Sequence, residues 1–292
     1  MKCIRRAAAK ADRYDAPVSG GAWSTAEGAA SWQASAAQRE RSMAETTELL
    51  LSSAGVGPGT RVLEIGAGTG DVALILARRV GAGGSVLATD ASAAMLEIAA
   101  RLAKEAGAAN VSTLAVRAEE LQLQPGSFDA AVSRNAVMFV SDLPRAFRAV
   151  RSALRPGGRV AASMWGPAER NPFHGVPVSA VRKRGAIPDP PPEIVQAFTL
   201  SDGKAVAGAL RDAGFTGVEV RKAKAGRSFS SLDDALRTAR EFPTFATLLG
   251  SLSADEREDV WNEIAREWSH FARTGRVEMP GEQLVVSGEN PR

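Results

Sequence analysis

The sequence predicts an α/β fold in which helices cover both faces of a mostly parallel sheet. Between positions 61 and 164, short apolar segments alternate with amphipathic segments of about 10–15 residues. Glycine and proline residues separate these segments, as is typical of the ends of helices and strands. The apolar runs VLEI, VLAT and AAV are continuous rather than alternating, which favours parallel strands buried on both faces.

The expected elements follow one another in a regular order. A helical stretch at 32–54 comes first, and it ends at a cluster of glycines and a proline that would stop a helix. The expected strands lie at 61–65, 85–89, 111–116, 128–133, 159–164, 215–222 and 283–287. The expected helices between them lie at 71–80, 93–106, 142–154 and 201–213.

Two further segments are expected to form a helical lid insertion over the sheet. Residues 1–30 are predicted to be a flexible tail, and residues 31–292 are expected to form one domain. The strand–helix alternation stops after the fifth strand, and residues 166–200 hold seven prolines. Helical patterns return across 231–273. Because ligands bind at the carboxyl edge of open α/β sheets, we expect the segments 166–200 and 231–273 to cover that edge.

Composition excludes several classes of protein. Hydrophobic residues make up 45% and charged residues 24% of the 292 residues, which is an ordinary globular balance. One cysteine and two histidines cannot build a Cys/His zinc cluster, so no metal is expected. The sequence lacks an apolar run of the ~18 residues that a membrane span needs. With no intrachain disulfide and no secretory signal, we expect a cytoplasmic location.

The run VLEIGAGTGD at 62–71 joins an expected strand to an expected helix. Its glycines permit a tight turn and a close approach of the backbone to a ligand. The dinucleotide fingerprint would place a third glycine where this chain has Asp71, so NAD fits poorly. The charge of Asp71 at the start of the helix favours a cationic or zwitterionic ligand over an anion. Asp90 ends the next strand, where a carboxylate can accept hydrogen bonds from ribose hydroxyls.

These residues resemble the class I S-adenosylmethionine-dependent methyltransferases. Residues 123–165 are similar to the fourth strand, the following helix and the fifth strand of that family. The run WGPAERNPF at 165–173 resembles bacterial relatives of the ubiquinone/menaquinone-biosynthesis methyltransferases. The resemblance covers 45–175 well and 200–225 loosely. It implies a Rossmann-like, mostly parallel seven-stranded sheet and S-adenosylmethionine as the cofactor, but it does not identify the methyl acceptor.

The resemblance also implies which residues line the cofactor site. Glu64 would lie beside the ammonium group of the cofactor, and Asp90 would hold its ribose. The glycine loop would pass under the methionine moiety with Gly66, Ala67, Gly68 and Gly70. The adenine would be contacted by Ala91, Met95, Ala118 and Glu119. Asn135 and Val140 would lie near the methionine end. Relatives often carry Asp where this chain has Arg117, and arginine cannot accept a hydrogen bond from the adenine amino group.

Few residues are available for acid–base chemistry. Methyl transfer from a sulfonium mainly needs donor and acceptor to be aligned, and a base is needed only if the acceptor must lose a proton. His174 follows the fifth strand on the expected ligand edge, so it is the candidate catalytic base. Weaker candidates for a role in the site are His270, Tyr14, Trp23, Trp32 and Arg134.

We therefore expect an enzyme that methylates carbon or oxygen of a small, largely apolar metabolite, such as a quinone precursor, polyketide or terpenoid. The alternatives are a cyclase or a binding protein that keeps the cofactor structurally on the same fold. The first 14 residues carry a net charge of +4 within a total of +3, so the body of the protein is nearly neutral. This balance argues against nucleic acid as a partner. The acceptor, the methylated atom and the oligomeric state stay open.

Overall fold

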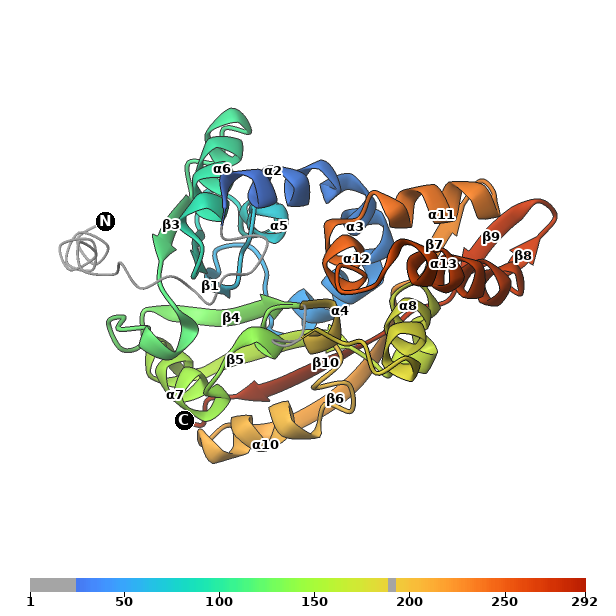
Figure 1. Ribbon diagram of the computed structural model, residues 1–292. Helices are drawn as coiled ribbons and strands as arrows, with labels where there is room; N and C mark the ends of the chain where they lie inside the picture. The colour runs from blue at the N-terminus through green and yellow to red at the C-terminus, as the bar shows by residue number, and fades with distance from the viewer. Residues whose placement is uncertain (1–24, 189–192) are drawn as a thin grey trace.

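The computed structural model describes residues 25–188 and 193–292, and a sheet lies at its centre (Figure 1). This sheet has seven strands. The strand order is β3-β2-β1-β4-β5-β10-β6. The strands are β1 (Arg61–Ile65), β2 (Ser85–Asp90), β3 (Val111–Ala115), β4 (Phe128–Arg134), β5 (Leu154–Trp165), β6 (Thr216–Lys224) and β10 (Glu282–Glu289). β1 to β5 are parallel, whereas β10 is antiparallel to both β5 and β6. The predicted mostly parallel seven-stranded α/β fold is confirmed.

Helices cover both faces of this sheet. One face carries α4 (Ala44–Ser53), α5 (Asp71–Val80) and α6 (Ala93–Glu105), and the other carries α7 (Leu143–Ala153) and α10 (Lys204–Asp212). Successive strand residues point to opposite faces, so Val62 packs with the first group and Leu63 with the second. The chain order reverses between β1 and β4, which are adjacent in the sheet. In open α/β folds this switch point is where a ligand crevice forms, at the carboxyl ends of the strands.

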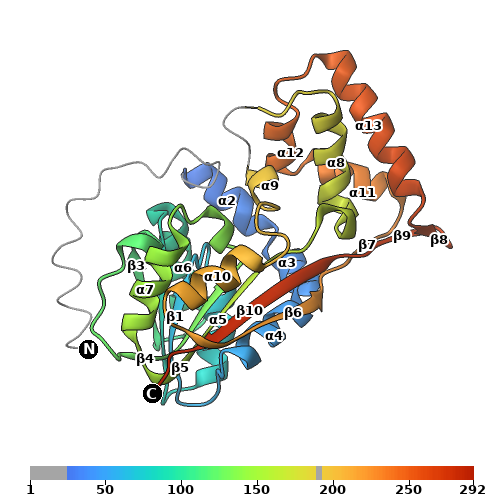
Figure 2. The same ribbon diagram turned by 90° about the horizontal axis from the view of Figure 1, so that it is seen from below.

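A second layer of helices has its own hydrophobic core, and we call it the cap. It consists of α8 (Pro172–Lys183), α9 (Glu193–Gln196), α11 (Leu232–Arg240), α12 (Pro243–Leu248), α13 (Ala254–Ser269) and a small sheet of β7 (Arg227–Phe229), β9 (Arg276–Met279) and β8 (Ala272–Arg273). Figure 2 shows the cap beyond the ends of β6 and β10, joined to them through β7 and β9. The small sheet was not predicted because strands of two to four residues are too short to show an alternating pattern.

The amino-terminal region differs from the predicted single helix at 32–54. It forms α2 (Ala26–Ala34), α3 (Ala36–Ser42) and α4, with breaks at Ser35 and Met43. At the first break, the Ser35 hydroxyl donates a hydrogen bond to the backbone carbonyl of Trp32. A side chain of this kind competes with the backbone N–H groups that would continue the helix. The predicted tail at 1–30 is too long, because α2 begins at Ala26 with the Thr25 hydroxyl capping its first turn.

Two of the residues considered as site candidates, Tyr14 and Trp23, lie outside the described residues. Within 25–188 and 193–292, no helix is long and apolar enough to cross a membrane.

Candidate active site

The glycine loop between β1 and α5 lies against two neighbouring segments. Gly66, Gly68 and Gly70 all have positive φ, of 69°, 55° and 88°. A Cβ on Gly66 would lie 2.1 Å from the Cβ of Ala136, in the loop after β4. A Cβ on Gly70 would lie 2.9 Å from the Cβ of Ala99 on α6. The turn therefore needs glycine both for its backbone conformation and for its close packing.

Asp90 ties the end of β2 to this loop. Its Oδ2 accepts a hydrogen bond from the backbone N–H of Gly68 at 2.8 Å, and its Oδ1 accepts one from Ser92 at 2.8 Å. Burial raises the pKa of the Asp90 carboxyl, and these backbone N–H donors partly oppose that effect. Each carboxylate oxygen has a further lone pair beyond the bond it already accepts. The carboxylate can therefore hold the loop and a ligand hydroxyl together.

Glu64 is a buried acid at the end of β1. Its side chain is 2% exposed, and its Oε2 has no hydrogen-bond partner among the described residues. Burial raises the pKa of Glu64 to about 8; the charge of Arg134 opposes this rise, whereas Asp71 and Asp90 add to it. An orphaned carboxylate oxygen beside a glycine cradle fits a ligand that brings a donor, above all a cationic one.

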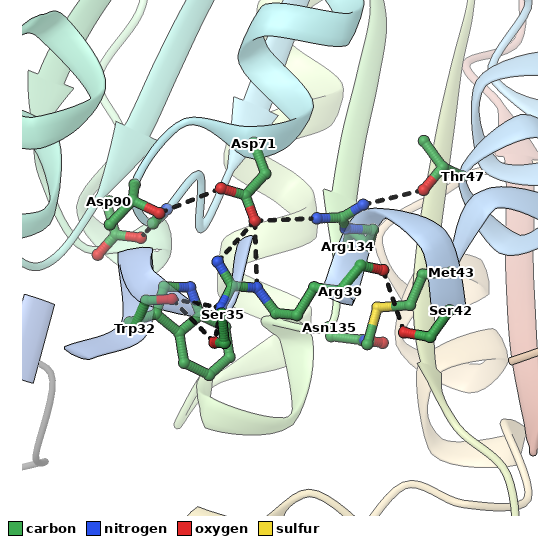
Figure 3. A network of polar contacts seen from close by, with 12 residues as sticks. Trp32, Ser35, Arg39, Ser42, Met43, Thr47, Asp71, Asp90, Arg134 and Asn135 are labelled. Carbon is green, nitrogen blue, oxygen red and sulfur yellow. Dashed lines mark hydrogen bonds and ion pairs between the residues drawn. The ribbon is translucent and has the colours of Figure 1, made fainter. Parts of the chain in front are cut away.

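Asp71 lies between two arginines at the start of α5 (Figure 3). Arg39 of α3 donates to Asp71 Oδ2 from Nε at 3.1 Å and from Nη2 at 2.7 Å. A guanidinium nitrogen of Arg134 lies 3.6 Å from the same oxygen, and Arg134 also donates to Thr47 of α4 at 3.0 Å. This buried network connects α3, α4, β4 and the glycine loop.

The network changes the electrostatic interpretation of Asp71. Sequence reasoning treated its carboxylate as a free charge that favours a cationic ligand. In the structure Arg39 pairs with that charge. The group that favours a cationic ligand is instead Glu64, whose carboxylate oxygen has no partner among the described residues. Arg134, a weaker candidate for an anionic substrate group, is likewise engaged with Asp71 and Thr47.

Trp32 lies over the glycine loop. Its indole Nε1 is 3.6 Å from where a Cβ on Gly68 would sit, and the guanidinium of Arg39 lies 4.1 Å from the centre of its ring. The carbonyl of Trp32 also accepts from Arg39. Helices α2 and α3 are thus held on the loop by one stacked arginine.

Asn135 follows β4 at the switch point and has a φ of 55°, which few residues other than glycine adopt. Its amide donates to the sulfur of Met43 at 3.4 Å, and its Oδ1 accepts from the hydroxyl of Ser163 on β5 at 3.4 Å. The side chain is therefore fixed beside the glycine loop, near Ala136. Val140 lies five residues further on, half-buried after a short 3-10 turn.

The residues expected to contact adenine lie at the ends of β2 and β3. Ala91 is half-buried directly after Asp90, and Met95 is buried in the first turn of α6. Ala118 and Glu119 form a 3-10 turn after β3. Glu119 accepts from the backbone and hydroxyl of Ser141 at 2.9 and 2.6 Å, and Arg117 lies 3.5 Å from it. The carboxylate of Glu119 thus fixes the loop that carries Val140.

His174 lies in the first turn of α8, buried among aromatic rings of the cap. Its ring centre is 4.8 Å from that of Trp165 and 4.9 Å from that of Phe173. Burial, and then the charge of Arg227, lower its pKa well below 6.5, so the imidazole is neutral at pH 7. The other histidine, His270, is exposed at the end of α13.

The buried polar residues that were not found from the sequence include Arg39, Arg227 and Gln283. Arg39 lies in a region read as one long helix, where no pattern singles it out. Arg227 begins the three-residue strand β7 of the cap, and Gln283 lies near the start of β10 in the central sheet. β7 does alternate between buried and exposed positions, but over three residues only, and β10 is buried along almost its whole length, so neither pattern singles out these two side chains.

Comparison with known proteins agrees with this geometry. Residues 62–158 match the family model described as a methyltransferase domain. The chain is 36% identical over 111 residues to the ubiquinone/menaquinone biosynthesis C-methyltransferase UbiE of Idiomarina loihiensis. This alignment covers 38% of this chain and 44% of that protein. It is 34% identical over 115 residues to a 2-phytyl-1,4-naphtoquinone methyltransferase of Trichormus variabilis, covering 39% of this chain and 50% of that protein. The chain thus spans about half the length of the curated relatives it matches.

Solved structures share the fold. A phosphoethanolamine N-methyltransferase of Haemonchus contortus aligns over 92% of this chain and 58% of its own, with a TM-score of 0.56 and 19% identity. The YcgJ protein of Bacillus subtilis aligns over 84% of this chain and 98% of its own, with a TM-score of 0.52 and 22% identity.

The family match over residues 62–158 and the mostly parallel seven-stranded sheet support a class I S-adenosylmethionine-dependent methyltransferase domain. Within that class, the matched segment is related to the ubiquinone/menaquinone C-methyltransferases, as the sequence predicted.

Proposed function

We propose that the protein transfers a methyl group from S-adenosylmethionine to carbon or oxygen of a small, largely apolar acceptor held under the cap. The orphaned carboxylate oxygen of Glu64 beside the glycine cradle is the observation that carries the proposal. An unpartnered buried acid is costly, and a ligand ammonium would remove that cost. The quinone-related names of the curated relatives favour an acceptor of the quinone-precursor type.

In this proposal, each cofactor group has a counterpart in the site. Glu64 receives the ammonium, the open lone pairs of Asp90 receive ribose hydroxyls, and Gly68 lets the backbone approach closely. The adenine would lie among the residues at the ends of β2 and β3, and the methionine end would lie beside Asn135 and Val140. The cofactor supplies a methyl group already activated on a sulfonium, so the protein has mainly to align the acceptor and exclude water.

His174 is the proposed base for an acceptor that must lose a proton. The neutral state of its imidazole leaves a lone pair available at pH 7. Its lowered pKa makes it a weak base, so it suits an acidic hydroxyl or carbon acid rather than an alcohol. The aromatic rings around it exclude water, which keeps the proton transfer inside the cap.

A turnover assay tests this function. The full chain is incubated with S-adenosylmethionine and a panel of phenols, quinols and 1,3-dicarbonyl acids, and S-adenosylhomocysteine is quantified. For an acceptor that turns over, we expect His174→Gln to lower kcat by about 10²–10⁴-fold with the cofactor Kd unchanged.

The matched control is His270→Gln, which changes the exposed histidine and should retain full activity. Cofactor binding without any S-adenosylhomocysteine across the panel would favour a cyclase or binding protein. Tighter binding of NAD than of S-adenosylmethionine would contradict the cofactor assignment.

A further inference from the structure

Within the part of the chain that the structure describes, Arg227 is a buried cation without an acidic partner. It is the first residue of β7 and is 7% exposed. Its Nε and Nη1 atoms have no hydrogen-bond acceptor among the described residues. Its guanidinium instead lies 4.4 Å from the ring centre of Phe173 and 5.7 Å from that of Phe242. Arginine is rarely buried unless it is paired, so this position needs an explanation.

The surroundings of Arg227 leave its positive charge uncompensated. Burial, and then the charge of Arg39, lower the pKa of Arg227 to about 10, so the group stays charged at neutral pH. The charge of Arg227 in turn lowers the pKa of His174. Aromatic rings attract a cation through their faces, but they cannot accept the directed N–H bonds of a guanidinium as strongly as an oxygen does. Two buried donor atoms therefore lack an acceptor among the described residues.

Gln283 is a second unsatisfied group on the sheet side of the same region. It is fully buried, and neither its Oε1 nor its Nε2 has a partner among the described residues. In the register of the sheet it lies opposite Trp165, whose ring contacts His174. Phe173 then connects His174 to Arg227, so Arg227 lies at one end of a row of neighbouring rings and Gln283 lies opposite Trp165 at the other end.

This row begins beside the proposed cofactor site. Val285 lies opposite Ser163, and the Ser163 hydroxyl contacts Asn135. Gln283 is two residues from Val285 on the same face of β10, a distance of about 7 Å along the strand. At the other end, Arg227 and Arg39 are close enough for one charge to lower the pKa of the other.

We propose that the methyl acceptor carries a carboxylate, which the guanidinium of Arg227 binds, and that the amide of Gln283 holds a second polar group of the same molecule. This inference rests on the proposed function and narrows its acceptor to a carboxylic acid with an otherwise apolar body. A guanidinium matches a carboxylate in shape, with two parallel N–H donors for two oxygens. One unpaired cation neutralises a single negative charge, whereas a phosphate dianion would keep an excess charge among aromatic rings.

Matched pairs of small probes test the inference on the full chain in the presence of S-adenosylhomocysteine. The probes are acetate, benzoate and 4-hydroxybenzoate, each compared with its neutral amide by ligand-observed NMR and by thermal stabilisation. We expect at least one carboxylate to bind more tightly than its amide. Arg227→Gln should weaken that carboxylate by at least about tenfold and leave the amide unchanged, because it removes charge-assisted hydrogen bonds.

Arg221→Gln is the control, since it removes an exposed arginine of the adjacent strand β6. Arg227→Lys, which keeps the charge and loses the two-pronged geometry, should retain part of the affinity. Retained binding of S-adenosylhomocysteine by each variant shows that the fold is intact. Equal carboxylate affinity in Arg227→Gln, no preference for any carboxylate, or preferential binding of inorganic phosphate at Arg227 would each overturn the inference. If the wild-type protein does not bind S-adenosylhomocysteine, the proposed function itself would be overturned.

Discussion

At the scale of single residues, the protonation of Glu64 links the fold to ligand binding. Its pKa in the folded protein is about 8, above the ordinary value of 4.5. The unliganded folded state therefore holds a proton that the unfolded chain releases, and the free energy of unfolding falls as the pH rises from 4.5 to 8. A ligand ammonium favours the ionised carboxylate, so binding should expel that proton.

This reasoning predicts a pH-dependent affinity for S-adenosylhomocysteine. Measured by calorimetry, the affinity should rise by roughly tenfold per pH unit between about pH 6 and pH 7, and it should level off above pH 8, because ionising Glu64 then costs nothing. Buffers of different ionisation enthalpy should report proton release. Glu64→Gln should bind more weakly and lose this pH dependence.

Glu97→Gln on the exposed side of α6 is the matched control, and it should keep the pH dependence of the wild-type protein. A pH-dependent affinity that survives in Glu64→Gln would show that another group titrates.

At this scale the sequence predicted a glycine loop and Asp90 at the ends of neighbouring strands, because each belongs to one short segment, and the family resemblance implied a role for Glu64; their contacts with the cofactor stay predictions. The sequence did not identify Arg39, Arg227 or Gln283. These side chains matter through contacts with segments far away in the chain, such as Arg39 with Asp71 and Arg227 with Phe173. A charge in a single segment is usually solvated, and only the fold shows that these are buried.

At the scale of elements, α2 and α3 form a strap over the glycine loop. From residue 32 onward the strap was predicted as part of one helix, since its breaks at Ser35 and Met43 carry neither glycine nor proline, and residues 26–30 were assigned to the tail. Arg39 holds it in place through Asp71, Trp32 and Ser35. The polar contact of the strap with the start of α5 therefore depends on one side chain, beside the packing of Trp32 on the loop.

Removing that side chain should loosen the strap. Arg39→Met keeps much of the volume but deletes the hydrogen bonds to Asp71, while Arg134 stays near the carboxylate. We expect the free energy of unfolding to drop by roughly 1.5–3 kcal/mol in urea titrations. Amide hydrogen exchange should accelerate in residues 26–42 and in the glycine loop.

Arg41→Met, at an exposed position of the same helix, is the control. It should change the free energy of unfolding by no more than about 0.5 kcal/mol and leave the hydrogen exchange of residues 26–42 unchanged. Unchanged exchange of residues 26–42 in Arg39→Met would mean that apolar packing, not this ion pair, holds the strap.

At the scale of the whole molecule, the sheet and the cap have separate hydrophobic cores. The alternation of strands and helices predicted the sheet because each unit buries its own apolar face. The cap helices were predicted only roughly, because their order in space depends on packing against one another. That the segments 166–200 and 231–273 close over ligands stays a prediction.

Hydrogen exchange tests that closure. Because the cap lies beside the proposed acceptor site, exchange in α8 and in α11 to α13 should slow when S-adenosylhomocysteine and a bound carboxylate are both present. Helix α7, which packs on the sheet and not in the core of the cap, is the internal reference and should not change. Equal exchange of the cap with and without both ligands would show that these segments are fixed packing.

The strands that join the two cores also restrict how the cap can move. β6 and β10 continue into β7 and β9 as one antiparallel ribbon, with the backbone N–H of Ala225 bonded to the carbonyl of Gly281 at the junction. A Cβ on Gly281 would lie 2.2 Å from the carbonyl oxygen of Ala225, so the two backbones touch there. Such a ribbon resists stretching and sliding but can twist about its long axis. Gln283 lies two residues to one side of this pivot and Arg227 two residues to the other, so a molecule spanning both would act as a brace across it.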